Sequence, residues 1–183
     1  MPIPRKILLA VAAACALAIA GCGGDNSNST GVTAPPPPGN SADRGFVNAI
    51  LPLHEKAVAI GVIGQTKGGG YVRDLSLKIA ESQSQETARI RSIGSALFSA
   101  GVPVGSTGVP RTTAADVSLK ALRLSTPFDQ AFFRAMIPIH EATIALCKAE
   151  IKRGDQVDLK TTSQQIIDVE SAQLATMRKR LKT

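Results

Sequence analysis

The chain contains only two histidines, and both lie at the same point of an internal repeat. His54 lies in segment 50–55, which reads ILPLHE, and His140 lies in segment 136–141, which reads MIPIHE. Imidazole is a common metal ligand and the side chain whose charge changes nearest to neutral pH. Because both histidines occupy equivalent positions, the sequence predicts that they contribute to one shared site.

The repeat extends far beyond the histidines. Its two halves align at a shift of 86 residues, and then at a shift of 87 because the connecting loops differ in length. Each unit is two segments joined by a loop, which is the size of a helical hairpin. The matched pairs are Asp43 with Asp129, Phe46 with Phe132, Ala49 with Ala135, Pro52 with Pro138, Ala59 with Ala145, Ile79 with Ile166, Ser84 with Ser171, Ala88 with Ala175 and Arg91 with Arg178.

Apolar residues recur at steps of three and four along four segments, which is typical of helices with one side facing a core. No segment shows strand alternation, so the sequence predicts an all-α four-helix bundle built from two repeated antiparallel helical hairpins. Thr126 is the expected N-cap of the third helix, with Pro127 at its first position and Asp129 closing a capping box. The predicted stripes run from Phe46 to Ile63, from Leu75 through Ser82 and Glu86 to Leu97, from Phe128 to Leu146 and from Leu159 to Leu181.

Glu86 and Glu170 interrupt otherwise apolar stripes, and His54 and His140 flank the seams of the first and third helices. A carboxylate buried without a partner is costly, so these groups are expected to meet one another, a water molecule or a metal. If the loop between the hairpins is a short-range connection, the first and third helices run parallel. If it crosses the full length of the bundle, they run antiparallel and the histidines meet near the middle.

Pro52 and Pro138 each precede a histidine by two residues, inside a predicted helix. A proline there removes one backbone hydrogen bond and kinks the chain. Two interpretations stay open: the kink aims the imidazole inward, or it relieves packing between helices.

The first 21 residues are predicted to be an export signal, because Arg5 and Lys6 precede the apolar run Ile7–Ala20. Segment 19–22 reads IAGC and resembles the bacterial lipobox, which implies cleavage before Cys22 and lipid attachment to its thiol. Residues 22–40 are rich in Pro, Ser and Asn and are expected to be a disordered tether. The folded domain is predicted at 41–183, with repeat one at 41–100, a crossing loop at 101–125 and repeat two at 126–183.

Composition excludes some function classes. The chain has a net charge of +7 but no Trp and one Tyr, and it lacks a recognisable nucleic-acid module, so nucleic-acid binding is not expected. The basic run 178–182 is interpreted as the cationic end of a helix, and attraction to anionic lipid headgroups stays open. Cys147 has no catalytic signature around it and is expected to pack as a small apolar residue.

At the repeated Pro-x-His segments the chain resembles the domain-of-unknown-function 305 family of exported bacterial proteins, whose members are ferritin-like four-helix bundles. The resemblance covers nearly all of the mature folded region, and repeat two matches better than repeat one. Some family members are linked to periplasmic copper, and His nitrogen with Met sulfur suits Cu(I). The second-helix positions of the family pattern correspond here to Gln83, Glu86 and Ile90 in repeat one, and to Glu170, Gln173 and Met177 in repeat two.

The family pattern is incomplete in this chain. Its first histidine is replaced by Leu53 and Ile139, and its downstream methionine by Ile60 and Leu146. Two His plus two Glu suit Zn(II), Fe(II) or Mn(II) better than Cu(I) by ligand hardness. The metal-ligand candidates that the resemblance leaves are His54, His140, Glu86, Glu170, Met136 and Met177.

Three functional interpretations follow. The first is a lipid-anchored module facing the periplasm, in the inner or outer membrane, that binds or sequesters copper or another transition metal. The second is a structural or protein-interaction lipoprotein of the envelope in which the polar layer holds no metal. The third is a ferritin-like redox enzyme, although the Glu-x-x-His pairs of di-iron bundles are missing, so no enzymatic activity is expected.

Overall fold

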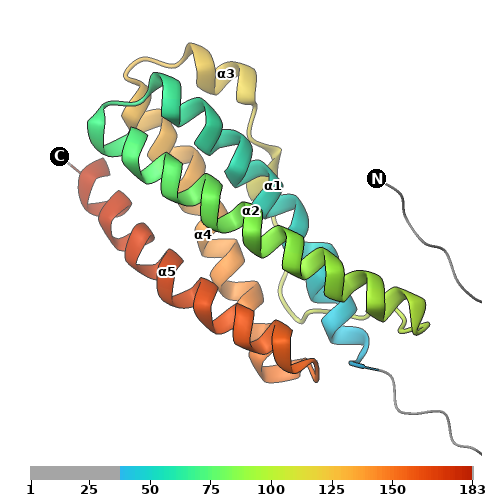
Figure 1. Cartoon of the computed structure of the whole chain (residues 1–183). Coiled ribbons are helices and arrows are strands. Elements are labelled where there is room, and N and C mark those ends of the chain that lie inside the picture. The colour runs from blue at the N-terminus through green and yellow to red at the C-terminus, as the bar shows by residue number, and fades with distance from the viewer. Residues whose placement is uncertain (1–37, 183) are drawn as a thin grey trace, which may run out of the picture. The chain divides into compact units, whose positions relative to one another are not determined.

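The computed structural model describes residues 38–182, and these form helices joined by turns, with no strand among them. Four long helices make the bundle, namely α1 (Ser41–Lys67), α2 (Gly70–Ser99), α4 (Phe128–Arg153) and α5 (Val157–Leu181) (Figure 1). The predicted all-α four-helix bundle, built from two antiparallel hairpins, is confirmed. The predicted export signal, Cys22 and the tether as far as residue 37 lie outside the described residues.

The local sequence explains where α1 begins, but it does not give the correct N-cap for α4. Asn40 caps α1, because its side chain accepts hydrogen bonds from Ala42 and Asp43, and the Asp43 carboxylate completes the capping box. The predicted cap of α4 was wrong, since Pro127 occupies the N-cap position and gives no side-chain hydrogen bond. The Asp129 carboxylate accepts a hydrogen bond from the start of α2 instead of closing a capping box.

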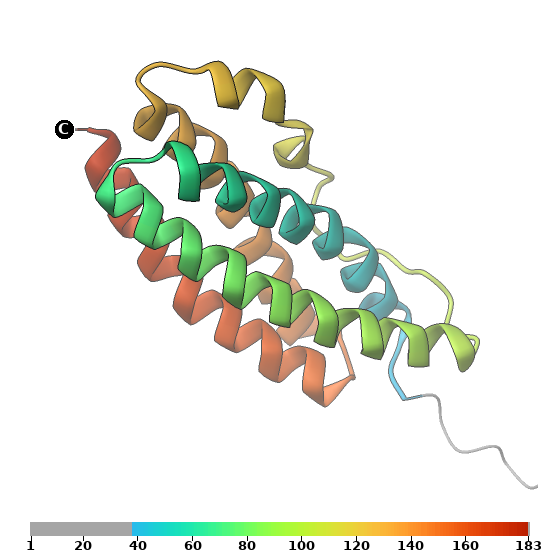
Figure 2. The same cartoon turned by 45° about the horizontal axis from the view of Figure 1, so that its top comes forward.

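The crossing segment between the hairpins is more structured than the predicted loop. It carries a 3-10 turn, η1 (Ala114–Asp116), and a short helix, α3 (Leu119–Leu124), which pack against α1 and α4 (Figure 2). The backbone N–H of Gly105 donates to Ser41 O at 2.7 Å, near the start of α1. Lys56 Nζ donates to Val117 O at 3.0 Å, further along the same helix. The segment therefore runs along α1, and α4 begins at the end of the bundle where α1 stops.

Two aspartates at equivalent repeat positions connect the hairpins. The Asp43 carboxylate of α1 accepts from the backbone N–H groups of Asp155 and Gln156 at 3.0–3.2 Å, at the start of α5. The Asp129 carboxylate of α4 accepts from the N–H of Gly69 at 2.9 Å, at the start of α2. Each hairpin thus supplies an acceptor for the free N–H groups of the other hairpin's second helix. The antiparallel arrangement of α1 and α4 is the second of the two expected topologies.

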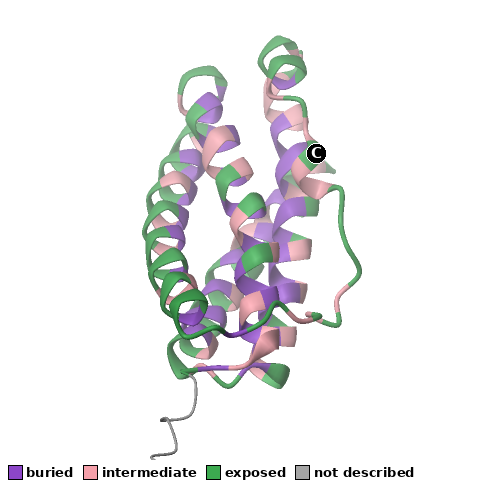
Figure 3. Cartoon of the chain, turned by 90° about the vertical axis from the view of Figure 1, so that its right-hand side faces the viewer, coloured by how far each residue is buried: buried purple, intermediate pink, exposed green. Residues whose placement is uncertain are grey.

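The core fills the space between the helices, and exposed residues cover the outside (Figure 3). The stripe predicted for α1 is buried, and so is that of α4 except for the half-buried Phe128; the stripe of α5 is largely buried. In α2 the prediction was off by one residue at mid-helix, because Gln83 and Thr87 are buried while Ser82 and Glu86 are half-buried. The largest fully buried apolar side chains are Phe46, Phe132, Ile50, Leu53, Ile60, Ile79, Ile90, Leu97, Met136, Ile139, Leu159 and Ile166.

Among the described helices, α1 alone is long and apolar enough to cross a membrane by length and composition. Half of its most apolar window is buried inside the bundle. The core helix of a bundle meets the same criterion, so α1 is accounted for by its place in the core.

Candidate functional site

His54 lies in α1 and its side chain is fully buried. Its Nδ1 is 3.8 Å from Oε2 of Glu86 on α2. Burial, together with the charge of His140, lowers the pKa of His54 to about 3, so the imidazole is neutral near pH 7. Burial also raises the pKa of Glu86 to about 7, which leaves this carboxyl partly protonated at neutral pH.

His140 lies in α4 and is buried to the same extent. Its Nε2 is 2.8 Å from Oε1 of Gln173 on α5. Because an amide oxygen only accepts, Nε2 carries the proton and Nδ1 carries the lone pair. Burial lowers the pKa of His140 to about 4, although the bond to Gln173 acts in the opposite direction. This imidazole is therefore also neutral near pH 7.

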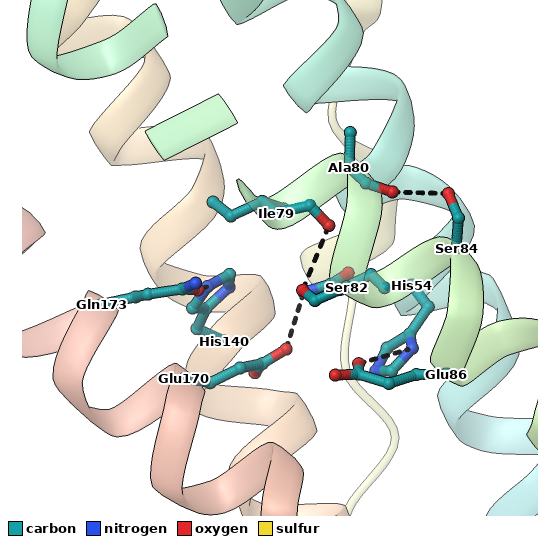
Figure 4. Close-up of polar contacts among 10 residues, drawn as sticks. His54, Ile79, Ala80, Ser82, Ser84, Glu86, His140, Glu170 and Gln173 are labelled. Atoms are coloured by element: carbon teal, nitrogen blue, oxygen red, sulfur yellow. Dashed lines mark hydrogen bonds and ion pairs between the residues drawn. The ribbon is translucent and has the colours of Figure 1, made fainter. Parts of the chain in front are cut away.

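Glu170 links the two second helices across the bundle. Its Oε1 accepts from Nε2 of Gln83 on α2 at 2.7 Å, and the side chain is 2% exposed. Burial, helped by the charge of Glu86, raises the pKa of Glu170 well above its usual value. The side chains of His54, Glu86, Gln83, Glu170, His140 and Gln173 form a polar layer inside the bundle. Figure 4 shows His54 with Glu86 on one side of this layer and His140 with Gln173 on the other, with Glu170 reaching between them.

Several nitrogen and oxygen atoms in this polar layer have no hydrogen-bond partner. They are both ring nitrogens of His54, Nδ1 of His140, Oε1 of Gln83, and one carboxylate oxygen each of Glu86 and Glu170. Unprotonated ring nitrogens and carboxylate oxygens are the atoms that coordinate metals, so the donor set fits a metal ion. Within residues 38–182, however, no three His, Cys, Asp or Glu side chains stand close enough together to hold one. Of the four predicted ligands the structure pairs only His54 with Glu86, whereas His140 is bonded to Gln173 and Glu170 to Gln83. Binding of all four to one metal stays a prediction.

Met136 and Met177 are also fully buried. Met136 precedes His140 by one helical turn, and Met177 follows Gln173 by one turn on the antiparallel partner helix. Because His140 and Gln173 are hydrogen-bonded to each other, Met136 and Met177 both lie one helical turn away from this bond, in the same direction along the second hairpin. The equivalent positions of the first hairpin hold Ile50 and Ile90, so the hairpins differ in the softness of their donors.

Cys147 is buried, in agreement with its expected role as a small apolar residue. Burial raises the pKa of its thiol, and the negative charge of Glu170 raises it further. Cys147 is therefore a neutral thiol in the folded chain, which makes it a poor metal ligand without proton loss.

Gln83 and Gln173 belong to the layer, although the sequence prediction did not place them among the site residues. The signal was available, because a shift of 87 aligns Gln83 with Glu170 and Glu86 with Gln173. Each hairpin therefore contributes one histidine, one acid and one amide, with acid and amide exchanged between repeats.

The repeated prolines face away from this layer. Pro52 and Pro138 are exposed and line a cavity of about 850 Å³ between α1, α4 and the crossing segment. Residues two apart on a helix are separated by roughly 200° of rotation, so each proline lies on the side opposite its histidine. This placement favours the interpretation in which the prolines shape contacts between helices and the crossing segment.

The two paired hairpins and their buried layer of His, Glu and Gln define a helical bundle with an internal polar site. The chain belongs to the family described as Domain of unknown function (DUF305), whose model matches residues 43–181. No curated protein is significantly similar to it in sequence.

Solved structures share the fold, among them two forms of CopM and a DUF305 fragment. CopM in the Cu(I)-bound form is 20% identical, has a TM-score of 0.65, and is matched over 76% of this chain and 95% of that chain. CopM in the Cu(II)-bound form gives 21% identity with the same score and coverage. A DUF305 fragment from Deinococcus radiodurans is 20% identical, with a TM-score of 0.61 over 80% of this chain and 99% of that chain.

Proposed function

We propose that this chain is a transition-metal-binding module that takes up Cu(I) in its buried polar layer. The observation that carries the proposal is the pair of buried, neutral imidazoles with unpartnered ring nitrogens in one layer of the bundle. The copper-bound forms of CopM, a bundle of the same fold, support it.

The second hairpin holds the softer donors. His140 Nδ1 together with the sulfurs of Met136 and Met177 would hold Cu(I), since imidazole and thioether suit that ion. His54 with Glu86, 3.8 Å apart, would form the harder half, suited to Zn(II) or Fe(II). Bound metal would supply a positive charge that the buried carboxyls could balance. The chain's own contribution is to hold neutral ligands in a site from which water is excluded.

The test is metal titration of the folded part of the chain, residues 38–183 without a histidine tag. Cu(I), Cu(II), Zn(II) and Fe(II) are titrated separately, and bound metal is measured by elemental analysis. We expect stoichiometric Cu(I) that is lost in the His54→Ala, His140→Ala double variant. Cu(I) affinity unchanged in that variant would refute the proposal.

The pseudo-symmetry provides a matched pair of variants. Met136→Ile with Met177→Ile gives the second hairpin the apolar residues of the first, and Cu(I) affinity is expected to fall by about tenfold or more while Zn(II) binding is kept. Ile50→Met with Ile90→Met adds thioethers to the first hairpin as the control for core repacking. A fall in Cu(I) affinity in both variants would assign the effect to packing and not to sulfur.

A second candidate is a structural polar layer without metal, in an envelope module that acts through protein contacts. The bonds Gln83–Glu170 and His140–Gln173 favour it, because they already satisfy part of the layer. In that case no metal binds, and His140→Ala lowers stability without changing any metal affinity. We also propose that the module is not catalytic; a metal-loaded chain that consumes oxygen or peroxide would contradict this.

We propose further that the module is a lipoprotein of the bacterial envelope that faces the periplasm. The proposal rests on the signal and lipobox pattern before Cys22. In cells, the full chain is expected in the membrane fraction, and Cys22→Ser is expected to release it into the soluble fraction. An unchanged distribution would argue against the lipid anchor.

A further inference from the structure

One end of the bundle carries a dense group of exposed cations. This basic end consists of the turn between α1 and α2, the short helix α3 and the last turn of α5, which lie at the same end in Figures 1 and 2. Arg180 stacks over the Tyr71 ring at 3.7 Å, which joins the end of α5 to the start of α2. Its cations are Lys67, Arg73, Lys120, Arg123, Lys179, Arg180 and Lys182.

Acidic residues are sparse there. The carboxylates in or next to these segments are Asp74, Asp129 and Asp116, of which Asp129 is bonded to the N–H of Gly69 and Asp116 lies three residues before α3. The opposite end is nearly balanced: its acids Asp43, Asp155 and Asp158 face the cations Arg44, Lys152, Arg153 and Lys160. The net positive charge of the bundle is therefore concentrated at one end.

Helix dipoles account for only part of this distribution. Cations are favoured at helix C-termini, which explains Lys67 and the last turn of α5. Arg73, in the first turn of α2, donates to the Gly68 carbonyl at 3.4 Å, so it also lies at the C-terminal end of α1. Lys120, however, lies in the first turn of α3, where a cation is unfavourable and where the helix has no acidic residue. An external anionic surface would offset that unfavourable placement.

Leu124 indicates what kind of anionic surface this is. Its side chain is 75% exposed and lies directly beside Arg123, at the end of α3. An exposed apolar side chain next to a cation, at an end of the bundle rich in cations, fits an anionic lipid surface, where the cations meet headgroups and the leucine enters the boundary of the acyl chains.

The length of chain before the bundle allows such a contact. The bundle is about 40 Å long, given the 27 residues of α1. The 17 residues between Cys22 and Asn40 can reach roughly 60 Å when fully extended. We propose that the basic end docks onto an anionic phospholipid bilayer, independently of any metal and of the lipid expected on Cys22.

The test is flotation of the bundle, residues 38–183, with vesicles of phosphatidylcholine mixed with phosphatidylglycerol and with vesicles of phosphatidylcholine alone. This part of the chain has its own closed core and lacks the predicted signal and Cys22. Binding is expected only to the anionic vesicles and is expected to weaken steeply with salt. Equal binding to both vesicle types, or none to either, would overturn the proposal.

Charge variants locate the contact. Neutralising four cations of the basic end should lower vesicle affinity by about tenfold or more, since each contributes near the surface. Neutralising four exposed cations elsewhere should lower it much less, and an equal loss would show that net charge alone drives binding. Tight binding to heparin without binding to anionic vesicles would instead identify a soluble polyanion as the partner and would refute docking onto a membrane. The test variant is Lys120→Gln, Arg123→Gln, Lys179→Gln, Lys182→Gln, and the control is Lys78→Gln, Arg89→Gln, Lys148→Gln, Lys152→Gln.

Discussion

Glu150 provides the sharpest prediction about stability, because it is a buried carboxyl beside another carboxyl. It lies in the last turn of α4, is 2% exposed, and lies beside the fully buried Asp43, to which it can donate a hydrogen bond only when it is protonated. Burial raises the pKa of Glu150 to about 9, and Asp43 adds to the rise, while the Lys160 ammonium opposes it. For Asp43, burial acts to raise the pKa, but the bonds from Glu150 and from backbone N–H groups lower it on balance. At neutral pH Glu150 is therefore protonated and Asp43 ionised.

The sign of the pH dependence follows from these shifts. The folded pKa of Glu150 lies above its unfolded value of about 4.5, so its protonated form stabilises the fold and this contribution is lost as pH rises toward 9. A rise from 4.5 to about 9 would correspond to roughly 6 kcal/mol if the fold did not relax. Relaxation of the fold and hydration of the ionised carboxyl reduce this figure, so we expect a loss of about 2–3 kcal/mol between pH 5 and pH 9.

The Glu150→Gln substitution keeps a side-chain hydrogen-bond donor toward Asp43 but removes the carboxyl group that titrates. Urea unfolding followed by circular dichroism from pH 5 to pH 9 should show equal stability of variant and wild type at low pH. At pH 9 the variant should be more stable by about 2–3 kcal/mol. The matched control is Glu141→Gln, an exposed carboxylate paired with Arg178, which should show no such gain. A difference between Glu150→Gln and wild type that stays constant over this range would refute the shared-proton pair.

Three further substitutions test single contacts. Gly154→Ala should destabilise the fold by about 2–3 kcal/mol in thermal unfolding, because its Cβ would collide with buried carboxylate oxygens, whereas Gly70→Ala, with no atom within 4 Å, should be tolerated. Gln83→Leu should cost about 1–3 kcal/mol in urea unfolding, because it removes the donor to the buried carboxyl across the bundle, and a neutral result would show that this carboxyl finds another partner. Arg91→Ala breaks an exposed ion pair and should change stability by less than about 1 kcal/mol; a larger loss in a double-mutant cycle with Glu55 would contradict this.

The helices themselves were predictable because their apolar stripes are strong and regular. The α2 stripe was misplaced at its centre, where Ser82 and Glu86 compete with Gln83 and Thr87 for the inner face. Residues next to each other on a helix differ by about 100° in direction, so a stripe interrupted by polar residues does not fix which pair faces inward. Burial of Gln83 is explained by its partner on α5, which no local pattern contains.

The start of α4 shows the same limit. Thr126 and Asp129 have the spacing of a capping box, and local sequence supports no other assignment. In the fold Asp129 accepts from Gly69, sixty residues away, so a tertiary partner replaces the local one. The equivalent Asp43 does both, since it closes the box of α1 and accepts from the start of α5. The direction of α4 depends on these contacts, and the length of the crossing segment alone allowed either direction.

The exchange of acid and amide between the repeats explains how a duplicated chain can bury this layer. Identical repeats would place a glutamate at both Gln83 and Glu170, or at both Glu86 and Gln173, and the buried like charges would repel each other. With one acid and one amide, Glu170 receives a hydrogen bond from Gln83, and Gln173 orients His140. The same divergence left thioethers only beside His140. The two imidazoles therefore occupy equivalent positions in the fold but different chemical surroundings, and a metal that binds this layer should favour one hairpin over the other according to its softness.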